Sequence, residues 1–286
     1  MTLKQLLWRG IAWAGATALV GVAYSTVIEP RWIEVTPVSL ALPGLAPEFC
    51  GFRIVHLSDI HMGDWMNAAR LHDVVRSVNT QSPDLVAITG DFITRRSESY
   101  LRDLACGLSR LNARDGVVAV LGNHDHWSGA RMVRDVLAAS GICELANTAL
   151  TLHRAGEHLH IAGVDDILVG RDRLDLAIAH LPADGAAILL AHEPDFADES
   201  AATGRFDLQL SGHTHGGQVV APVVGPLLLP YLGRKYPSGR YRVGEMIQYT
   251  NRGIGMVSPY VRFNCRPEIT VLDLHARVNC ACMIRA

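Results

Sequence analysis

The stretch Phe52-Arg-Ile-Val-His-Leu-Ser-Asp-Ile-His61 decides the fold that we expect for this chain. It begins with a largely apolar run, which is typical of a strand buried inside a sheet, and the run stops at Ser58-Asp59. Between residues 71 and 78, apolar side chains then recur at the spacing of one helical face. The stretch therefore predicts a buried strand that places polar residues at its carboxyl end, followed by a helix.

The same unit occurs twice more along the chain. The predicted strands cover residues 85–89 and 117–121, and the predicted helices cover 100–111 and 132–137. The first of these strands ends at Gly90-Asp91, and the second ends at Gly122-Asn123-His124-Asp125. Strands that alternate with helices indicate an α/β arrangement with parallel pairing. Ligands of such sheets bind beyond the carboxyl ends of the strands, where these polar residues fall.

The second half of the sequence contains more strands than helices. A hairpin is predicted at 148–154 and 158–164, a helix at 174–180, and strands at 186–190, 206–210, 246–250 and 269–274. The strand at 186–190 is followed by His192, and the strand at 206–210 is followed by the run Gly212-His-Thr-His-Gly-Gly217. We therefore expect an α/β fold in which two β-sheets pack together and helices flank them.

The first thirty residues carry a targeting signal. Lys4 and Arg9 precede an uncharged, mostly apolar stretch, Gly10–Ile28, which has the length of a membrane-spanning helix. We expect an uncleaved transmembrane anchor with the rest of the chain outside the cytoplasm. The alternative is a signal peptide cleaved near Gly21-Val22-Ala23, which would release a secreted or periplasmic protein.

Composition limits the remaining functions. With 286 residues, of which 49% are hydrophobic, the chain can bury a large core. Its formal net charge of -2 provides no basic field, so we expect no nucleic-acid partner. Six cysteines are too few for a disulfide-built scaffold of this length. Cys280 and Cys282 fall in a short tail, where a metal-binding pair would need a second pair that the sequence lacks.

Seven side chains at the predicted strand ends are candidate metal ligands. They are Asp59, His61, Asp91, Asn123, His192, His213 and His215. Singly, each has an ordinary structural alternative, such as a helix cap or a hydrogen-bonded core histidine. Together they offer oxygen and nitrogen donors but no thiolate, which suits two divalent ions such as Mn, Zn, Fe or Mg. Two such ions ~3.5–4 Å apart hold a phosphoryl oxygen and activate water, so the set predicts phosphoester hydrolysis.

The order of these blocks resembles the calcineurin-like metallophosphoesterases. Asp59-Ile-His61, Gly90-Asp91, Gly122–Asp125, His192 and Gly212–His215 stand in the order of the five family motifs. The resemblance spans about residues 52–274 and implies a two-sheet sandwich flanked by helices. It also implies a metal-dependent phosphoesterase with a phosphoester substrate.

The resemblance implies a division of the ligands between two ions. One ion would be held by Asp59, His61 and His215. The other would be held by Asn123, His192 and His213, with Asp91 bridging both. Further catalytic roles would fall to His124, which would assist the phosphoryl transition state or the leaving oxygen, and to Asp125, which would orient His124.

A narrower likeness is to the membrane-associated bacterial branch of YkuE- and YaeI-type phosphodiesterases. It rests on residues 189–196, 252–255 and 262–269, and it implies hydrolysis of a phosphodiester or pyrophosphate bond in a lipid-linked or cell-envelope substrate. Thr94 stands where purple acid phosphatases carry a tyrosine ligand, which argues against an iron–tyrosinate enzyme. A phosphomonoesterase, a nuclease and a non-catalytic binding scaffold remain the alternatives.

This interpretation divides the chain into four parts. We expect a membrane anchor or signal segment at 1–30, a connecting strand at 31–51, the catalytic domain at 52–275 and a C-terminal tail at 276–286. Arginines and lysines between 234 and 266 form either a solvated surface or a site for a diphosphate or an anionic head group. The apolar residues of 227–232 form either a lip against the bilayer or an ordinary buried loop.

Overall fold

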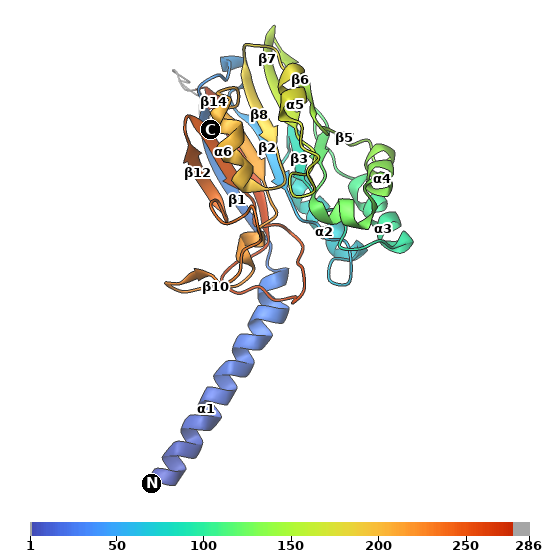
Figure 1. Ribbon diagram of the computed structural model, residues 1–286. Helices are drawn as coiled ribbons and strands as arrows, with labels where there is room; N and C mark the ends of the chain where they lie inside the picture. Colours follow the sequence, from blue (N-terminus) through green and yellow to red (C-terminus); the bar gives the residue numbers. More distant parts are fainter. Residues whose placement is uncertain (1, 277–286) are drawn as a thin grey trace.

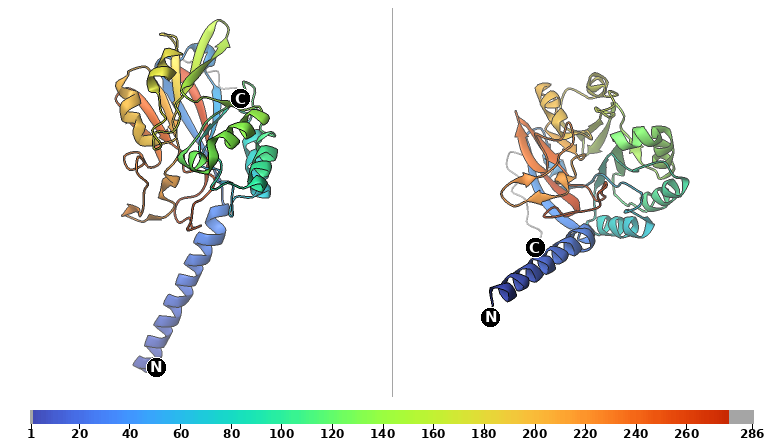
Figure 2. Two further views of the ribbon diagram at one scale, coloured as in Figure 1. Left: turned by 45° about the vertical axis from the view of Figure 1, so that its right-hand side comes forward. Right: turned by 60° about the horizontal axis from the view of Figure 1, so that its bottom comes forward.

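Two β-sheets packed face to face form the centre of the molecule (Figure 1). The computed structural model describes residues 2–276, and within this range each main sheet has six strands. Helices cover the outer face of each sheet, and one long helix projects from an end of the domain (Figures 1 and 2). The predicted α/β architecture of two packed sheets flanked by helices is confirmed.

The first sheet has the strand order β1-β14-β2-β3-β4-β5. These strands are β1 (Glu34–Leu42), β14 (Glu268–Ala276), β2 (Phe52–Leu57), β3 (Leu85–Thr89), β4 (Val117–Val120) and β5 (Cys143–Glu144). The strands from β2 to β5 pair in parallel, and β14 pairs antiparallel with β2. Three helices connect the parallel strands, namely α2 (Ala68–Thr80), α3 (Glu98–Leu108) and α4 (Asn123–Ala139). β1 closes one edge by pairing in parallel with β14.

The second sheet has the order β12-β13-β9-β8-β7-β6. These strands are β12 (Gly239–Val243), β13 (Met246–Thr250), β9 (Leu208–Ser211), β8 (Ala186–Leu190), β7 (Glu157–Gly163) and β6 (Thr148–Arg154). The four central strands are parallel, and a hairpin closes each edge. Two short helices, α5 (Leu174–Ala179) and α6 (Ala197–Ala202), pack on its outer face. A small ribbon of β10 (Val220–Ala221) and β11 (Gly225–Pro226) lies apart from both sheets.

Successive side chains of the central strands point to opposite faces of the sheet, and this separates the core between the sheets from the core under the helices. On β2, Ile54 packs into the core between the two sheets, whereas Val55 and Leu57 pack against the helices outside. The buried face of α2 begins with Leu71 and ends with Val78, at the predicted spacing. Both faces of these strands are covered by protein, which explains why their sequences are continuously apolar.

The carboxyl ends of strands from both sheets meet at one place. The loop after β2 donates from Asp59 N to Gly90 O of the loop after β3, over 3.0 Å. Gly212 N, after β9, donates to His192 O, after β8, also over 3.0 Å. Each of these bonds joins two loops of the same sheet, and the bond from His213 N to the carboxylate of Asp59, over 3.0 Å, joins the two sheets.

The N-terminal helix differs from the prediction. α1 (Leu3–Ala23) is followed by a π-helical turn, Tyr24–Ile28. Among the described residues, no helix combines the length with the apolar character that crossing a membrane requires. The transmembrane helix predicted over Gly10–Ile28 is therefore not supported. The predicted stretch is divided between the last part of α1 and the π-helical turn. The first part of α1 contains polar and charged residues, among them Lys4 and Arg9.

The predicted C-terminal tail begins at Ala276, which is the last residue of β14. Residues 277–286, with Cys280 and Cys282, lie outside the described part of the chain.

Candidate metal centre

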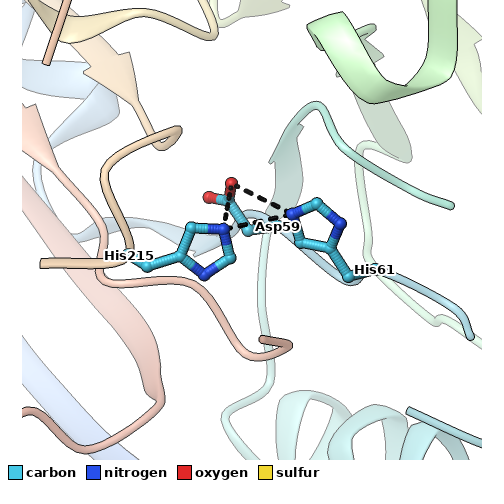
Figure 3. A group of neighbouring side chains, drawn as sticks. All are labelled: Asp59, His61 and His215. Carbon is cyan, nitrogen blue, oxygen red and sulfur yellow. Dashed lines mark hydrogen bonds and ion pairs between the residues drawn. The ribbon is translucent and has the colours of Figure 1, made fainter. Parts of the chain in front are cut away.

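Asp59, His61 and His215 form one compact group of candidate ligands (Figure 3). The Nε2 atoms of His61 and His215 lie 3.1 Å apart. Asp59 Oδ1 lies 3.4 Å from Nε2 of His215 and 3.9 Å from Nε2 of His61. All three side chains are buried, and they come from the end of β2 and from the turn after β9. The fold thus unites donors that are more than 150 residues apart in sequence.

Asp91 lies between this group and a second one. Its Oδ2 atom lies 3.3 Å from Nε2 of His61 and 3.3 Å from Nε2 of His192. Its other carboxylate oxygen accepts the backbone N–H of His124 over 2.9 Å. Asp59, Asp91 and His192 also place one ligand atom each within 4.8 Å of one another. A carboxylate in this position can contact both groups of donors at once.

Backbone carbonyl groups set the proton positions of two histidines in the second group. Nδ1 of His192 lies 2.7 Å from Thr89 O, and Nε2 of His213 lies 2.9 Å from Tyr231 O. A carbonyl oxygen can only accept, so these two ring nitrogens carry the protons. The other nitrogen of each ring can bind a cation through its lone pair once it carries no proton, and these two atoms face each other over 3.3 Å. A carbonyl oxygen that accepts the proton of one ring nitrogen commonly orients an imidazole that binds metal through the other.

Of the buried polar atoms that lack a partner among the described residues, two belong to candidate ligands. Oδ1 of Asn123 and Nδ1 of His215 accept or donate no hydrogen bond there. Buried polar atoms of this kind are rare, and each needs an explanation. Asn123 is the first residue of α4, next to His124, and it lines the same pocket as Asp91 and His213. A cation bound by this amide oxygen would satisfy it, so the donor set fits divalent ions.

The backbone at the site is strained. Asp59, His61, Asp91, His213 and His215 all have positive φ angles, between 47° and 70°. Residues with a Cβ rarely adopt this conformation, and strain of this kind concentrates at functional sites. It turns each side chain sharply away from the direction of its strand, toward the common centre.

Glycines permit the close approach of these loops. A Cβ atom on Gly122 would collide with Asp91 and His192, and one on Gly212 would collide with Ser58 and Asp59. Only glycine fits these two positions of the motifs Gly122-Asn123 and Gly212-His213.

His124 faces the pocket beside the candidate ligands. It is half-buried, and its ring makes an edge-to-face contact with the ring of His61, with centroids 4.8 Å apart. Burial lowers the pKa of His124, although the charge of Asp91 acts in the opposite direction. The ring is therefore mostly neutral at neutral pH until a negatively charged group approaches it.

Asp125 does not orient the His124 ring as predicted. Its carboxylate accepts the backbone N–H groups of Phe92, Ile93 and Gly122, over 2.9, 3.1 and 3.0 Å. The carboxylate points from the first turn of α4 into the loop after β3, because those backbone donors would otherwise be buried without an acceptor. Asp125 therefore ties α4 to the loop that carries Asp91.

Neighbouring charges keep Asp91 ionised. Burial alone would raise the pKa of its carboxyl group, but the imidazoles of His192 and His61 outweigh burial and hold the pKa well below its usual value. An ionised carboxylate is the form that binds a cation.

A pocket of about 660 Å³ opens beside these side chains. It is lined by Asp91, His124 and His213, by Trp127, whose ring centroid lies 5.0 Å from that of His124, and by residues 227–231, which follow β11. Its size is typical of a site for a small molecule.

Sequence motifs did not indicate three supporting contacts. Tyr231 acts through its backbone carbonyl, and Cys265 donates from Sγ to His215 O over 3.2 Å. Nε2 of His126 lies 2.7 Å from Asp165 Oδ1. Contacts made by backbone atoms leave no side-chain pattern in a sequence, so the first of these contacts could not have been predicted.

The chain matches the calcineurin-like phosphoesterase family over residues 52–217, and it belongs to that family. Enzymes of this class hydrolyse phosphoesters at a binuclear centre of divalent metal ions, so the predicted activity class and cofactor are confirmed.

Sequence identity to individual proteins indicates the branch of the family to which the chain is most similar. It is 37% identical over 281 residues to the uncharacterized metallophosphoesterase YkuE of Bacillus subtilis, a match that covers 96% of this chain and 98% of that protein. It is 32% identical over 260 residues to phosphodiesterase YaeI of Escherichia coli, covering 89% and 93%. A bovine transmembrane protein with a metallophosphoesterase domain is 33% identical, and the match covers 64% of its length. The predicted YkuE/YaeI branch is confirmed.

Proposed function

We propose that the chain hydrolyses a phosphodiester or pyrophosphate bond in a lipid-linked or cell-envelope substrate. The observation that carries the proposal is the position of Asp91, whose Oδ2 atom lies 3.3 Å from Nε2 of both His61 and His192. A single carboxylate between two groups of donors suits a pair of ions rather than one.

The donors divide into two sets around Asp91. Asp59, His61 and His215 would hold one ion, since their ligand atoms already form one group. Asn123, His192 and His213 would hold the other, with the histidine tautomers fixed by Thr89 and Tyr231. When bound, the two ions supply charge to the phosphoryl oxygens and lower the pKa of water.

His124 would donate a proton to the leaving oxygen. Its backbone N–H is held by Asp91, and its ring lines the pocket where the phosphoester would lie. The negative charge of a bound phosphoester would raise the pKa of this imidazole, so that it takes up a proton from solvent and passes it to the leaving oxygen as the P–O bond breaks. Asp125 contributes by fixing the first turn of α4, which carries His124, to the loop after β3.

A membrane surface is the proposed place of action. The bovine relative is named as a transmembrane protein, and the large apolar side chains of Trp13, Leu19 and Val20 on α1 are exposed. The exposed Val223 and Val224, in the turn between β10 and β11, add a second apolar feature. Such side chains are stabilised by transfer from water to lipid.

The test is hydrolysis of bis(p-nitrophenyl) phosphate by the purified protein with Mn, Mg or Zn added separately. We expect metal-dependent turnover that Asp91→Asn abolishes while circular dichroism stays unchanged. Asp135→Asn, the same chemical change at an exposed position of α4, should retain the wild-type rate. Undiminished turnover by Asp91→Asn would refute the proposed centre.

A parallel screen separates the alternative substrates. Phosphomonoesters, nucleotide-diphospho-lipids and single-stranded DNA are compared at equal concentration. The proposal expects the diester and the lipid-linked diphosphate to exceed the others. Preferential turnover of DNA would instead identify a nuclease.

A further inference from the structure

We infer that the pocket beside the metal centre binds a hydrocarbon chain of the substrate, so that the substrate is a phosphoester lipid. The inference rests on the proposed function and specifies its substrate. The hydrocarbon would lie against Trp127, Leu227, Leu228, Leu229 and Tyr231, which we call the apolar wall.

The apolar wall is exposed to an unusual degree. Leu228 is 81% exposed, Tyr231 67%, Trp127 63% and Leu227 61%. Single exposed apolar residues are common, but a contiguous group of large ones indicates a binding site. Here four of them line one pocket, and two further exposed residues, Val223 and Val224, precede them in the β10–β11 turn. In the stretch 227–232, which was predicted to form either a lip or a buried loop, Leu227, Leu228 and Tyr231 are exposed, whereas Leu229 and Leu232 are half-buried.

The apolar wall has a fixed place relative to the catalytic groups. The carbonyl of Tyr231 accepts the Nε2 proton of His213 over 2.9 Å, and Leu227 N donates to Val219 O over 3.0 Å. Asp91, His124 and the wall line one continuous pocket. A molecule with its phosphoester at Asp91 would therefore place its nearest substituent against the apolar wall.

The charges near the pocket do not suit a polyanionic substituent. Of the described residues that line the pocket, none is Lys or Arg. Three of the basic residues of 234–266 that were considered for a diphosphate site have other partners. Lys235 pairs with Asp198, Arg252 pairs with Glu34 and Glu268, and Arg262 is buried against backbone carbonyls. A nucleic acid or polyphosphate strand would normally meet several free cations.

The position of the ribbon agrees with a lipid substrate. Figures 1 and 2 show β10 and its ribbon at the end of the domain from which α1 projects. The exposed apolar residues of α1 and those of the β10–β11 turn therefore belong to the same end of the molecule. A lipid at a membrane surface would approach the pocket from that end.

The test uses p-nitrophenyl phosphodiesters whose second ester group is ethyl, butyl or octyl. All three release the same chromophore, and they are compared below their aggregation concentrations with the metal-loaded, full-length protein. Because each buried methylene improves binding by up to about fourfold, kcat/KM should rise with chain length, with an octyl-to-ethyl ratio above about ten.

Leu228→Gln should lower this ratio by about threefold or more, because it puts an amide where the chain would lie. The matched control is Leu176→Gln on α5, which is also exposed but lies away from the pocket, and it should keep the wild-type ratio. An octyl-to-ethyl ratio near one in the wild type would overturn the apolar subsite while leaving phosphodiester hydrolysis intact. Failure to hydrolyse any of the esters would overturn both proposals.

Discussion

The imidazole of His213 donates from Nε2 to the carbonyl oxygen of Tyr231 over 2.9 Å. This hydrogen bond leaves Nδ1 of His213 with its lone pair directed toward His192. We therefore predict that His213→Ala lowers the metal content from about two ions per chain to about one. Elemental analysis after dialysis measures the content, and His153→Ala, an exposed histidine on β6, serves as the control. Two tightly held ions in His213→Ala would remove His213 from the ligand set.

Gly212→Ala should disturb both stability and metal binding. A Cβ atom at this position would collide with Ser58 and Asp59, so the loops after β2 and β9 would have to separate. Overpacking of this kind costs about 1–3 kcal/mol of the free energy of unfolding.

Gly21→Ala is the matched control, because a Cβ at that position of α1 meets nothing within 4 Å. Urea denaturation and metal analysis are compared for the two variants. Equal stability and equal metal content would show that the two loops are not in close contact.

His56 should make the protein sensitive to acid. Burial lowers the pKa of its imidazole from 6.5 to about 3, so between these values the unfolded chain binds a proton that the folded protein excludes. The free energy of unfolding should therefore fall as pH decreases from about 6.5 toward about 3. One proton contributes a slope of about 1.4 kcal/mol per pH unit.

His56→Leu removes this titration and should flatten the pH dependence by that amount. The measurement is urea denaturation of the metal-free protein at several pH values within the window. Identical slopes for the wild type and His56→Leu would mean that the imidazole is not buried in its neutral form.

Residues 24–31, which follow α1, should stabilise the folded domain. Glu29 is 1% exposed and accepts the backbone N–H of Cys265, while Ser25 O accepts the backbone N–H of Arg262. Cys265 in turn contacts His215 O. Removing residues 1–31 should therefore lower the melting temperature by about 4–10 °C relative to a chain that lacks only 1–23.

Differential scanning calorimetry of the two truncated proteins checks this prediction. An equal melting temperature would mean that residues 24–31 contribute no stability.

The local sequence pattern was sufficient to predict the bounds of strands that are continuously apolar and end in polar residues. The bounds of β2, β3, β8 and β13 match the predicted ranges. α4 consists of two helical segments that meet at Gly129, where φ is 121°, and the predicted helix at 132–137 lies in the second segment. The first segment was not predicted, because it begins with Asn123, His124 and Asp125 instead of apolar residues. β12 was not predicted, since it is an edge strand in which charged residues alternate with smaller or apolar ones.

At the candidate metal centre, the order of the motifs identified the candidate ligands but not the hydrogen bonds around them. All seven candidate ligands lie together, because the strands that precede them end at the same place. The role of Asp125 was predicted wrongly, since the sequence does not show that Phe92 and Ile93 present buried N–H donors. The contact between Cys265 and His215 joins segments 50 residues apart and has no local signal.

Anomalous X-ray diffraction from crystals soaked in Mn²⁺ tests the central claim most directly. We predict two anomalous peaks that flank the carboxylate of Asp91, one beside Asp59, His61 and His215 and the other beside Asn123, His192 and His213. A single peak, or peaks away from Asp91, would contradict a centre of two ions bridged by this residue.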